Sequence, residues 1–182
     1  MALPNEGSGN GGQFGSALPL EAFLEDARSL SPAAFETRHG SGFLLLTATR
    51  LASPKATYST DVQLVGDEDG RSEDTGSLSI LVYPVRFATH IATVGRASKN
   101  DVVIPDPSVS RVHALLKRGE NGVFLMRDAG SSNGTTVNGV SVLPRGQGMP
   151  TELKPGDSVR LGRVEFTFVD AAAMRNYVLQ TD

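Results

Sequence analysis

The chain has 182 residues, of which 39% are hydrophobic, and this is enough apolar material for one core of ordinary size. It contains no cysteine, which excludes a disulfide framework, a thiolate metal site and a cysteine nucleophile. The formal net charge of −3 argues against general nucleic-acid binding, because proteins of that class usually carry a basic surplus.

Charge and apolar residues are unevenly distributed along the chain. Residues 88–118 carry five Lys or Arg and two Asp, for a net charge of +3, whereas residues 61–76 carry one Arg and six Asp or Glu, for a net charge of −5. No apolar run is longer than that of Phe43–Leu46, which is too short to cross a bilayer, and the N-terminus lacks a basic segment followed by an apolar one. We therefore expect a cytoplasmic protein that neither spans nor binds a membrane.

The first 77 residues predict a tail followed by a mainly helical segment. Residues 1–17 are rich in glycine and too poor in apolar side chains to order, so we expect a disordered tail. Hydrophobic residues then recur at helical spacing, at Leu20, Phe23, Leu24 and Ala27. A second short helix is predicted to begin after Ser31 as the N-cap, with Pro32 at its first position. Residues 42–49 are typical of a buried strand, and residues 50–76 of a long loop that contains the acidic cluster.

From Leu78 onward, short strand-like runs alternate with Gly, Pro, Asn and Asp. The predicted strands are 78–87, 90–94, 102–104, 112–117, 123–127, 158–161 and 164–168. Pro84 interrupts the first of them and indicates an edge position or a bulge. In the last, Val164, Phe166 and Phe168 alternate with polar residues, as expected for a strand with one buried face. Many short strands predict an all-β sandwich, and residues 171–180 predict a terminal helix with Met174, Tyr177 and Val178 on one side.

Six short motifs lie in order within and between these strands: Gly95-Arg96, Ser110-Arg111-Val112-His113, Ser131-Ser132-Asn133-Gly134-Thr135, Asn138-Gly139, Gly156-Asp157 and Leu161-Gly162. Their order and spacing resemble the forkhead-associated (FHA) domain over residues 78–170. The resemblance implies an FHA-type β-sandwich of about 11 strands. It would be preceded by an extension with one or two short helices, residues 18–77, and followed by a short C-terminal helix, residues 171–182.

The resemblance also implies a phosphothreonine-peptide site where three loops of the sandwich meet. The residues that it assigns to peptide binding are Arg96, Ser110, Arg111, Ser132 and Asn133, with Ser108 and Ser131 in the loops that select flanking residues. The residues that it assigns to the architecture of the loops are Gly95, His113, Gly134, Asn138 and Gly139. Within this set, Asn133 and Arg111 would contact the peptide, Asn133 through the peptide main chain.

The chemistry of a phosphoryl group fits these residue types. A phosphothreonine carries about −1.5 to −2 charges near neutral pH and has three strong acceptor oxygens. Arg96 offers a permanently charged planar set of donors, and the hydroxyls of Ser110 and Ser132 can complete the shell. Taken alone, Arg96 would be an ordinary surface arginine. Its position directly after Gly95, within the complete set of motifs, favours phosphate contact.

Catalytic and metal-binding interpretations have less support. Ser110 and His113 could be a nucleophile and a base, but three residues apart on an emerging strand they would point to opposite faces. The three histidines, His39, His90 and His113, lack a plausible metal-ligand spacing. No nucleotide-binding loop, kinase signature or nucleophile elbow is present. We expect no catalytic residue, no metal and no cofactor.

The sequence therefore predicts a non-catalytic, bacterial-type FHA adaptor in Ser/Thr kinase signalling. Its expected partners are phosphothreonine-containing proteins such as a Ser/Thr kinase or its substrates, and neither nucleic acid nor membrane. The alternative is a phosphate-independent scaffold that binds a folded partner through a sheet face. An enzyme is the third hypothesis.

A regulatory site is predicted at Thr75, which follows Glu73-Asp74 at the end of the acidic segment. Some small bacterial FHA proteins resemble a closed switch, in which a phosphorylated N-terminal threonine occupies the protein's own pocket. Phosphorylation of Thr75 would then reduce binding of an external phosphopeptide.

Overall fold

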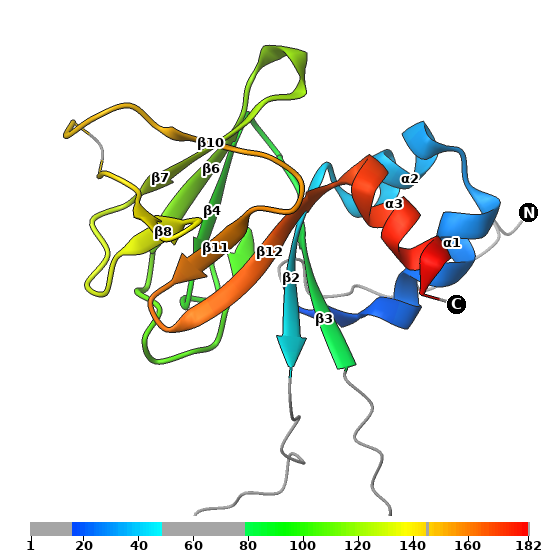
Figure 1. The fold of residues 1–182 in the computed structure, drawn as a ribbon, viewed down its shortest axis with the longest axis horizontal. Coiled ribbons are helices and arrows are strands. Elements are labelled where there is room, and N and C mark those ends of the chain that lie inside the picture. The colour runs from blue at the N-terminus through cyan, green and yellow to red at the C-terminus, as the bar shows by residue number, and fades with distance from the viewer. Residues whose placement is uncertain (1–15, 49–78, 145, 182) are drawn as a thin grey trace, which may run out of the picture.

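The computed structural model describes residues 16–48, 79–144 and 146–181, which fold into two β-sheets with a layer of helices at one side (Figure 1). The predicted β-sandwich is confirmed, and the described residues form 12 strands rather than about 11. None of the helices in these three ranges is long and apolar enough to cross a membrane.

The larger sheet is entirely antiparallel, and its strands lie in the order β1 (Leu18–Pro19), β3 (Ser79–Val85), β2 (Gly42–Ala48), β12 (Val164–Asp170), β11 (Ser158–Leu161), β8 (Thr135–Val137) and β9 (Val140–Ser141). The smaller sheet has the order β10 (Thr151–Leu153), β7 (Phe124–Asp128), β6 (Ala114–Arg118), β4 (Ile91–Gly95) and β5 (Val102–Val103), with only β4 and β5 parallel. Strand β2, from the predicted extension, is hydrogen-bonded between β3 and β12 and so belongs to the larger sheet.

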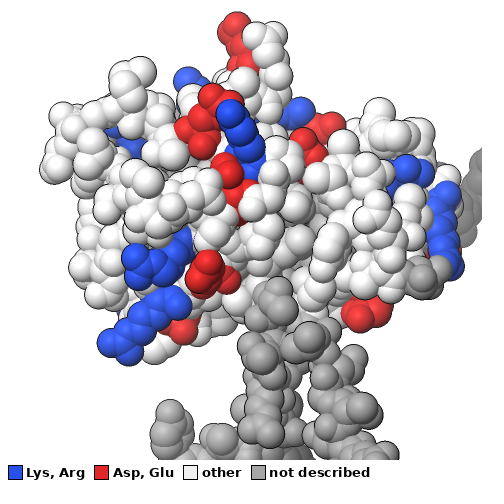
Figure 2. Space-filling model, in the orientation of Figure 1, with Lys and Arg blue, Asp and Glu red and all other residues white. Residues whose placement is uncertain are grey.

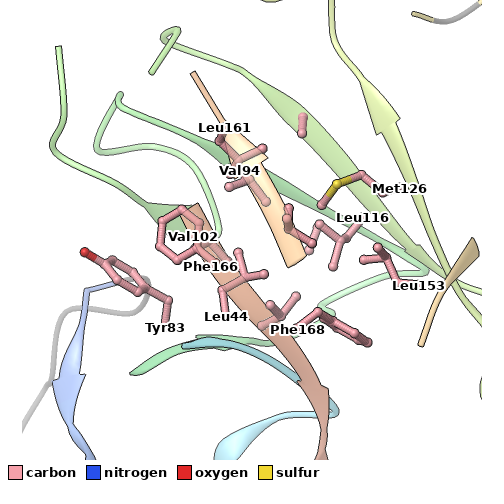
Figure 3. Close-up of a cluster of buried hydrophobic side chains, with 14 of the residues drawn as sticks. Leu44, Tyr83, Val94, Val102, Leu116, Met126, Leu153, Leu161, Phe166 and Phe168 are labelled. Atoms are coloured by element: carbon pink, nitrogen blue, oxygen red, sulfur yellow. The ribbon is translucent and has the colours of Figure 1, made fainter. Parts of the chain in front are cut away.

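The main hydrophobic core fills the space between the two sheets (Figure 3). Phe166 and Phe168 of β12 are buried, whereas Glu165 and Thr167 between them are exposed, which is the predicted alternation. From the opposite sheet, Leu116 packs into the same cluster. The strands that enclose this core are arranged so that the loops after β4, β5 and β7 lie together at one end of the sandwich.

A second core lies between the larger sheet and the helices, which are η1 (Leu20–Phe23), α1 (Leu24–Ser29), α2 (Pro32–His39) and α3 (Ala171–Gln180). Strand β2 contributes to both cores, because Leu44 faces the sandwich interior while Phe43 and Leu45 face the helices. A strand covered on both faces is apolar along its whole length, which explains the Phe43–Leu46 run. Phe35 of α2 is fully buried in this second core.

The helix boundaries follow local capping signals. The Ser31 hydroxyl accepts a hydrogen bond from the Ala34 amide at 3.3 Å, and Pro32 occupies the first turn, as predicted. At the start of α3, the Asp170 carboxylate accepts from the Ala173 amide at 2.7 Å. Each cap satisfies a backbone donor that has no partner within its own helix.

Polar contacts also connect the helices to one another and to the smaller sheet. Arg118 at the end of β6 forms an ion pair with Glu36 at 2.6 Å and donates to the Ser41 hydroxyl at 2.7 Å. His39 lies 2.7 Å from the Asp26 carboxylate. Burial lowers the pKa of His39 below its ordinary value, and the nearby Asp26 carboxylate offsets only part of this effect.

Several sequence-based expectations need correction or fall outside the described residues. Strands β1, β8, β9 and β10 were not predicted, because each is only two or three residues long. The terminal helix is confirmed as α3, and of the three residues predicted to lie on one side of it, Met174 and Val178 are buried and Tyr177 is 37% exposed. The predicted loop 50–76 and nearly all of the tail 1–17 lie outside the described residues.

We expect the substitution Phe35→Ala to lower the free energy of unfolding by about 3–5 kcal/mol, because it empties a fully buried aromatic site. Urea denaturation followed by circular dichroism would measure this change. The control is Met149→Ala at an 84% exposed side chain, for which we expect a change within about 0.5 kcal/mol. A loss below about 1 kcal/mol for Phe35→Ala would contradict the packing of α2 against the sheet.

Candidate functional site

Three loops meet at the end of the sandwich that carries the β11–β12 turn. They connect β4 to β5, β5 to β6, and β7 to β8. Together they enclose an open hollow of about 640 Å³, lined by Arg96, Ala97, Lys99, Pro107, Ser108, Val109, Ser110, Arg111, Val112, Gly130, Ser132 and Asn133. The structure therefore brings together all five residues that the sequence assigns to peptide binding.

The first two loops are joined through their backbones. A Cβ atom at Gly95 would lie 2.5 Å from the Arg111 carbonyl oxygen, so only glycine allows this approach. Beside it, the Arg96 amide donates to the Ser110 carbonyl at 2.9 Å, and the Ala97 amide donates to the Arg111 carbonyl at 3.2 Å. The backbone of Arg96 is thus held against that of Ser110.

His113 joins the second loop to the third. Its ring is fully buried, and its Nδ1 accepts a hydrogen bond from the Ser110 amide at 2.9 Å. The proton is therefore on Nε2, which donates to the Gly134 carbonyl at 3.1 Å. Because backbone groups occupy both ring nitrogens, His113 is not placed to act as a general base for Ser110.

The Arg96 guanidinium is positioned at the surface of the hollow. Its Nε donates to the Val109 carbonyl at 3.1 Å, and within the described residues its two terminal nitrogens have no hydrogen-bond partner. The Ser110 hydroxyl accepts from the Ser132 amide at 3.0 Å, which leaves its own proton available to an acceptor. Donors of two loops are therefore presented to the same space.

Asn133 is also held at the rim of the hollow. Its Nδ2 donates to the Ser108 carbonyl at 2.7 Å, so its side-chain oxygen remains available as an acceptor. The exposed Ser132 hydroxyl forms no hydrogen bond to the described part of the chain. The hydroxyls of Ser108 and Ser131, by contrast, are engaged within the protein, with Asp106 and Asp128 respectively.

The Asp128 carboxylate holds the third loop in shape. It accepts hydrogen bonds from the amides of Gly130 and Ser131 at 2.7 and 2.8 Å, and from the hydroxyls of Ser131 and Thr135, both at 2.6 Å. Burial by itself would raise the pKa of Asp128, but these four hydrogen bonds outweigh it and leave the pKa below its ordinary value. The carboxylate is therefore ionised at neutral pH.

The charged side chains that line the hollow are all basic. Three exposed cations line it, Arg96, Lys99 and Arg111, and no acidic side chain is among its lining residues. None of the three forms an ion pair with another residue of the described ranges. Figure 2 shows basic side chains at the end of the sandwich where the β11–β12 turn lies, with acidic side chains beside them. The arrangement suits an anionic ligand.

Two residues of the site were not predicted from the sequence. Lys99 contributes a third cation to the hollow. Asn100 is buried, and its Nδ2 donates to the carbonyls of Ala97 and Arg111, both at 2.7 Å, so it joins the first two loops. The Lys99-Asn100-Asp101 sequence is typical of a turn, and that turn signal alone does not place either side chain at a site.

Of the remaining architectural residues, Gly134 belongs to the third loop, whereas Asn138 and Gly139 lie at the other end of β8, where Asn138 is hydrogen-bonded to Asp157 and Ser158. Thr75 lies outside the described residues. Asn138 and Gly139 both have positive φ, 50° and 79°, in the two-residue turn between β8 and β9. Gly134 has a φ of 76°, and its carbonyl also accepts from the Gly162 amide. The regulatory role of Thr75 remains a prediction.

Comparison with known proteins gives matches in the same region. The family model of the FHA domain matches residues 92–162. The chain is 39% identical over 82 residues to the ABC transporter ATP-binding/permease protein Rv1747 of Mycobacterium tuberculosis, a match that covers 45% of this chain and 9% of that protein. It is 37% identical over 100 residues to the oxoglutarate dehydrogenase inhibitor of Corynebacterium diphtheriae, which covers 55% of this chain and 61% of that protein.

These two matches each span less than two thirds of the relative's own length. Among solved structures, the FhaA FHA domain complexed with the intracellular domain of Rv3910 is 32% identical, with a TM-score of 0.41, and the match covers 48% of this chain and 87% of that one. The family match and the sequence relatives agree with the six motifs and with the loops that they build. Residues 92–162 are therefore identified as an FHA domain within this chain.

Proposed function

We propose that the hollow binds phosphothreonine-containing segments of other proteins and that the chain is a non-catalytic adaptor in Ser/Thr kinase signalling. The main support for the proposal is the position of the Arg96 guanidinium. Its Nε is fixed by Val109, and its remaining donors face an acid-free hollow beside the Ser110 hydroxyl. Recognition of phosphorylated motifs through arginine-containing sites is an established mode for FHA domains.

The donor set matches a phosphate monoester better than a carboxylate. A phosphate offers three acceptor oxygens and about two negative charges, which can engage Arg96, Lys99 and the Ser110 hydroxyl together. A carboxylate has one charge and two oxygens and would leave part of this set unused. The free side-chain oxygen of Asn133 can accept a hydrogen bond from the peptide main chain, which would fix the direction of the bound segment.

The signalling role follows from the chemistry of the ligand. Phosphothreonine is produced by Ser/Thr kinases, so a protein that binds it forms complexes that depend on kinase activity. The partners are then a phosphorylated kinase or a kinase substrate. His113 argues against an enzymatic function of this site, because its two ring nitrogens are bonded to the backbone.

We expect Arg96→Ala to weaken binding of a phosphothreonine peptide by about tenfold to a hundredfold, because hydrogen bonds to charged groups contribute roughly 1.5–3 kcal/mol. A degenerate phosphothreonine peptide library would first select a ligand for the full chain, and isothermal titration would then measure its affinity. Removal of the phosphate should abolish binding. Ser110→Ala should weaken it by about threefold to tenfold, since one neutral donor is lost.

The matched control for Arg96→Ala is Arg160→Ala, which removes an exposed arginine from β11 outside the hollow and should leave the affinity unchanged. Equal binding of the phosphorylated and unphosphorylated peptides would refute the proposed function. Binding that survives both Arg96→Ala and Ser110→Ala would instead favour the phosphate-independent scaffold.

We expect Asp128→Asn to lower both peptide affinity and stability at pH 7, because it removes the charge that orders residues 130–135. The loss of unfolding free energy should be about 2 kcal/mol. Folding lowers the pKa of Asp128, so its contribution is fully present above the ordinary value of 3.8 and is lost as the pH falls through the lower pKa of the folded state.

Urea denaturation of the wild type and Asp128→Asn at pH 7 and at successively lower pH would measure this effect. The difference in unfolding free energy should be largest at pH 7 and should shrink below pH 3.8. A difference that stays constant down to the acid limit of the folded protein would mean that the Asp128 charge does not stabilise the loop.

A further inference from the structure

The outward face of the smaller sheet carries an ordered pattern of apolar and charged side chains. Strand register places one row across β4, β6, β7 and β10, consisting of Ile91, Lys117, Leu125 and Glu152. The next row consists of Thr93, Leu115 and Arg127. Their sequence neighbours Ala92, Leu116 and Met126 are buried in the sandwich core, so these two rows face outward. We call them the outer face.

The outer face is uncovered in the part of the chain that the structure describes. The four helical elements of the layer pack on the other sheet, against β2, β3 and β12 (Figure 1). On the outer face, Ile91 is 48% exposed although it begins a central strand. A shallow hollow of about 430 Å³ lies there, lined by Ile91, Leu115, Lys117, Leu125, Arg127 and Pro150.

The hollow on the outer face is lined by two cations and no acidic side chain, since Glu152 lies at the β10 edge outside the lining and the Asp101 carboxylate is hydrogen-bonded to Thr93. This lining favours an acidic, partly apolar ligand. Lys117 lies between Ile91 and Leu125 in its row, and Arg127 is paired with Leu115 in the next. Neither cation forms an ion pair with any residue of the described ranges. Cations set among aliphatic side chains are complementary to carboxylates set among aliphatic side chains.

The outer face is continuous with the phosphothreonine site. Strand β4 carries Ile91 and Thr93 on the outer face and leads directly into Arg96. At about 3.3 Å per residue, Arg96 lies roughly 17 Å along the strand from Ile91. A protein held at Arg96 by its phosphothreonine would therefore have neighbouring segments within reach of this face.

We propose that the outer face is a second docking surface for the phosphorylated partner and that it binds a segment in which apolar side chains are interleaved with Asp or Glu. This inference rests on the proposed function, which places the phosphothreonine of the partner at Arg96. The two contacts reinforce each other, because binding at Arg96 raises the local concentration of the second segment to the millimolar range. Weak contacts at the outer face then add selectivity among phosphothreonine segments.

The probe that tests this is a phosphothreonine peptide selected on the full chain and extended at either end by a Gly/Ser linker and a randomised segment. A linker of about ten residues has a reach of about 17 Å, which matches the separation along β4. Selection on the wild type should enrich segments that combine Asp or Glu with Leu, Ile, Val or Phe. Absence of such enrichment at both ends would overturn the proposal.

The decisive variant is Lys117→Gln with Arg127→Gln. It should weaken binding of the extended probe by about fivefold, because the two cations can no longer form ion pairs with the acidic residues of the probe, and it should leave binding of the short phosphopeptide unaffected. The matched control, Lys154→Gln with Arg160→Gln, removes two exposed cations that do not line the 430 Å³ hollow, and it should change neither affinity. Thermal unfolding would verify that both double variants remain folded. Equal affinity of the decisive variant and the wild type for the extended probe would refute the proposal.

Binding of the short phosphothreonine peptide alone separates this inference from the proposed function. If the wild type does not bind that peptide, the proposed function fails. The randomised segments would then be selected on the full chain without the phosphopeptide. Amide shifts in a nuclear magnetic resonance titration that cluster at Ile91, Leu115 and Leu125 would support the outer face alone. Shifts that cluster elsewhere, or no shifts, would overturn it.

Discussion

The close approach of the end of β4 to the segment before β6 determines the geometry of the binding site. Gly95 allows the two backbones to meet, and the hydrogen bond from the Arg96 amide to the Ser110 carbonyl aligns them. The buried ring of His113 then attaches the third loop through Gly134. The guanidinium and the hydroxyl that we propose to contact the phosphate are therefore positioned by backbone contacts beneath them, so the proposed site is largely formed in the absence of a peptide.

The rigidity of this backbone contact depends in turn on two cores that share one sheet. Strand β2 is buried on both faces, with Leu44 in the sandwich and Phe43 under the helices. The helical layer is tied to the smaller sheet by the ion pair between Arg118 and Glu36. The helices at both chain ends therefore brace the sandwich, and they cover only one of its two outer surfaces.

Elements with a strong local signal were predicted well, and those defined by distant contacts were not. The cap at Ser31, the alternation of Phe166 and Phe168, and the terminal helix each follow from neighbouring residues. Strands β1 and β8 to β10 are too short to show a period, and they exist because partner strands pair with them. The site residues came from motif resemblance. Lys99 and Asn100 lack such a motif, and only the fold brings them to the hollow.

The exposure of the site limits what it can recognise alone. Arg96, Lys99 and Arg111 are accessible to solvent and salt, so their attraction for phosphate is screened and depends little on the surrounding peptide. A reader that relied on them alone would bind many phosphothreonine segments with similar affinity. Selectivity can then come from a neighbouring surface, and the helices already cover the outer side of β2, β3 and β12 in the larger sheet. The smaller sheet, whose strand β4 ends at Gly95 directly before Arg96, presents such a surface, because its outer face is uncovered in the described part of the chain.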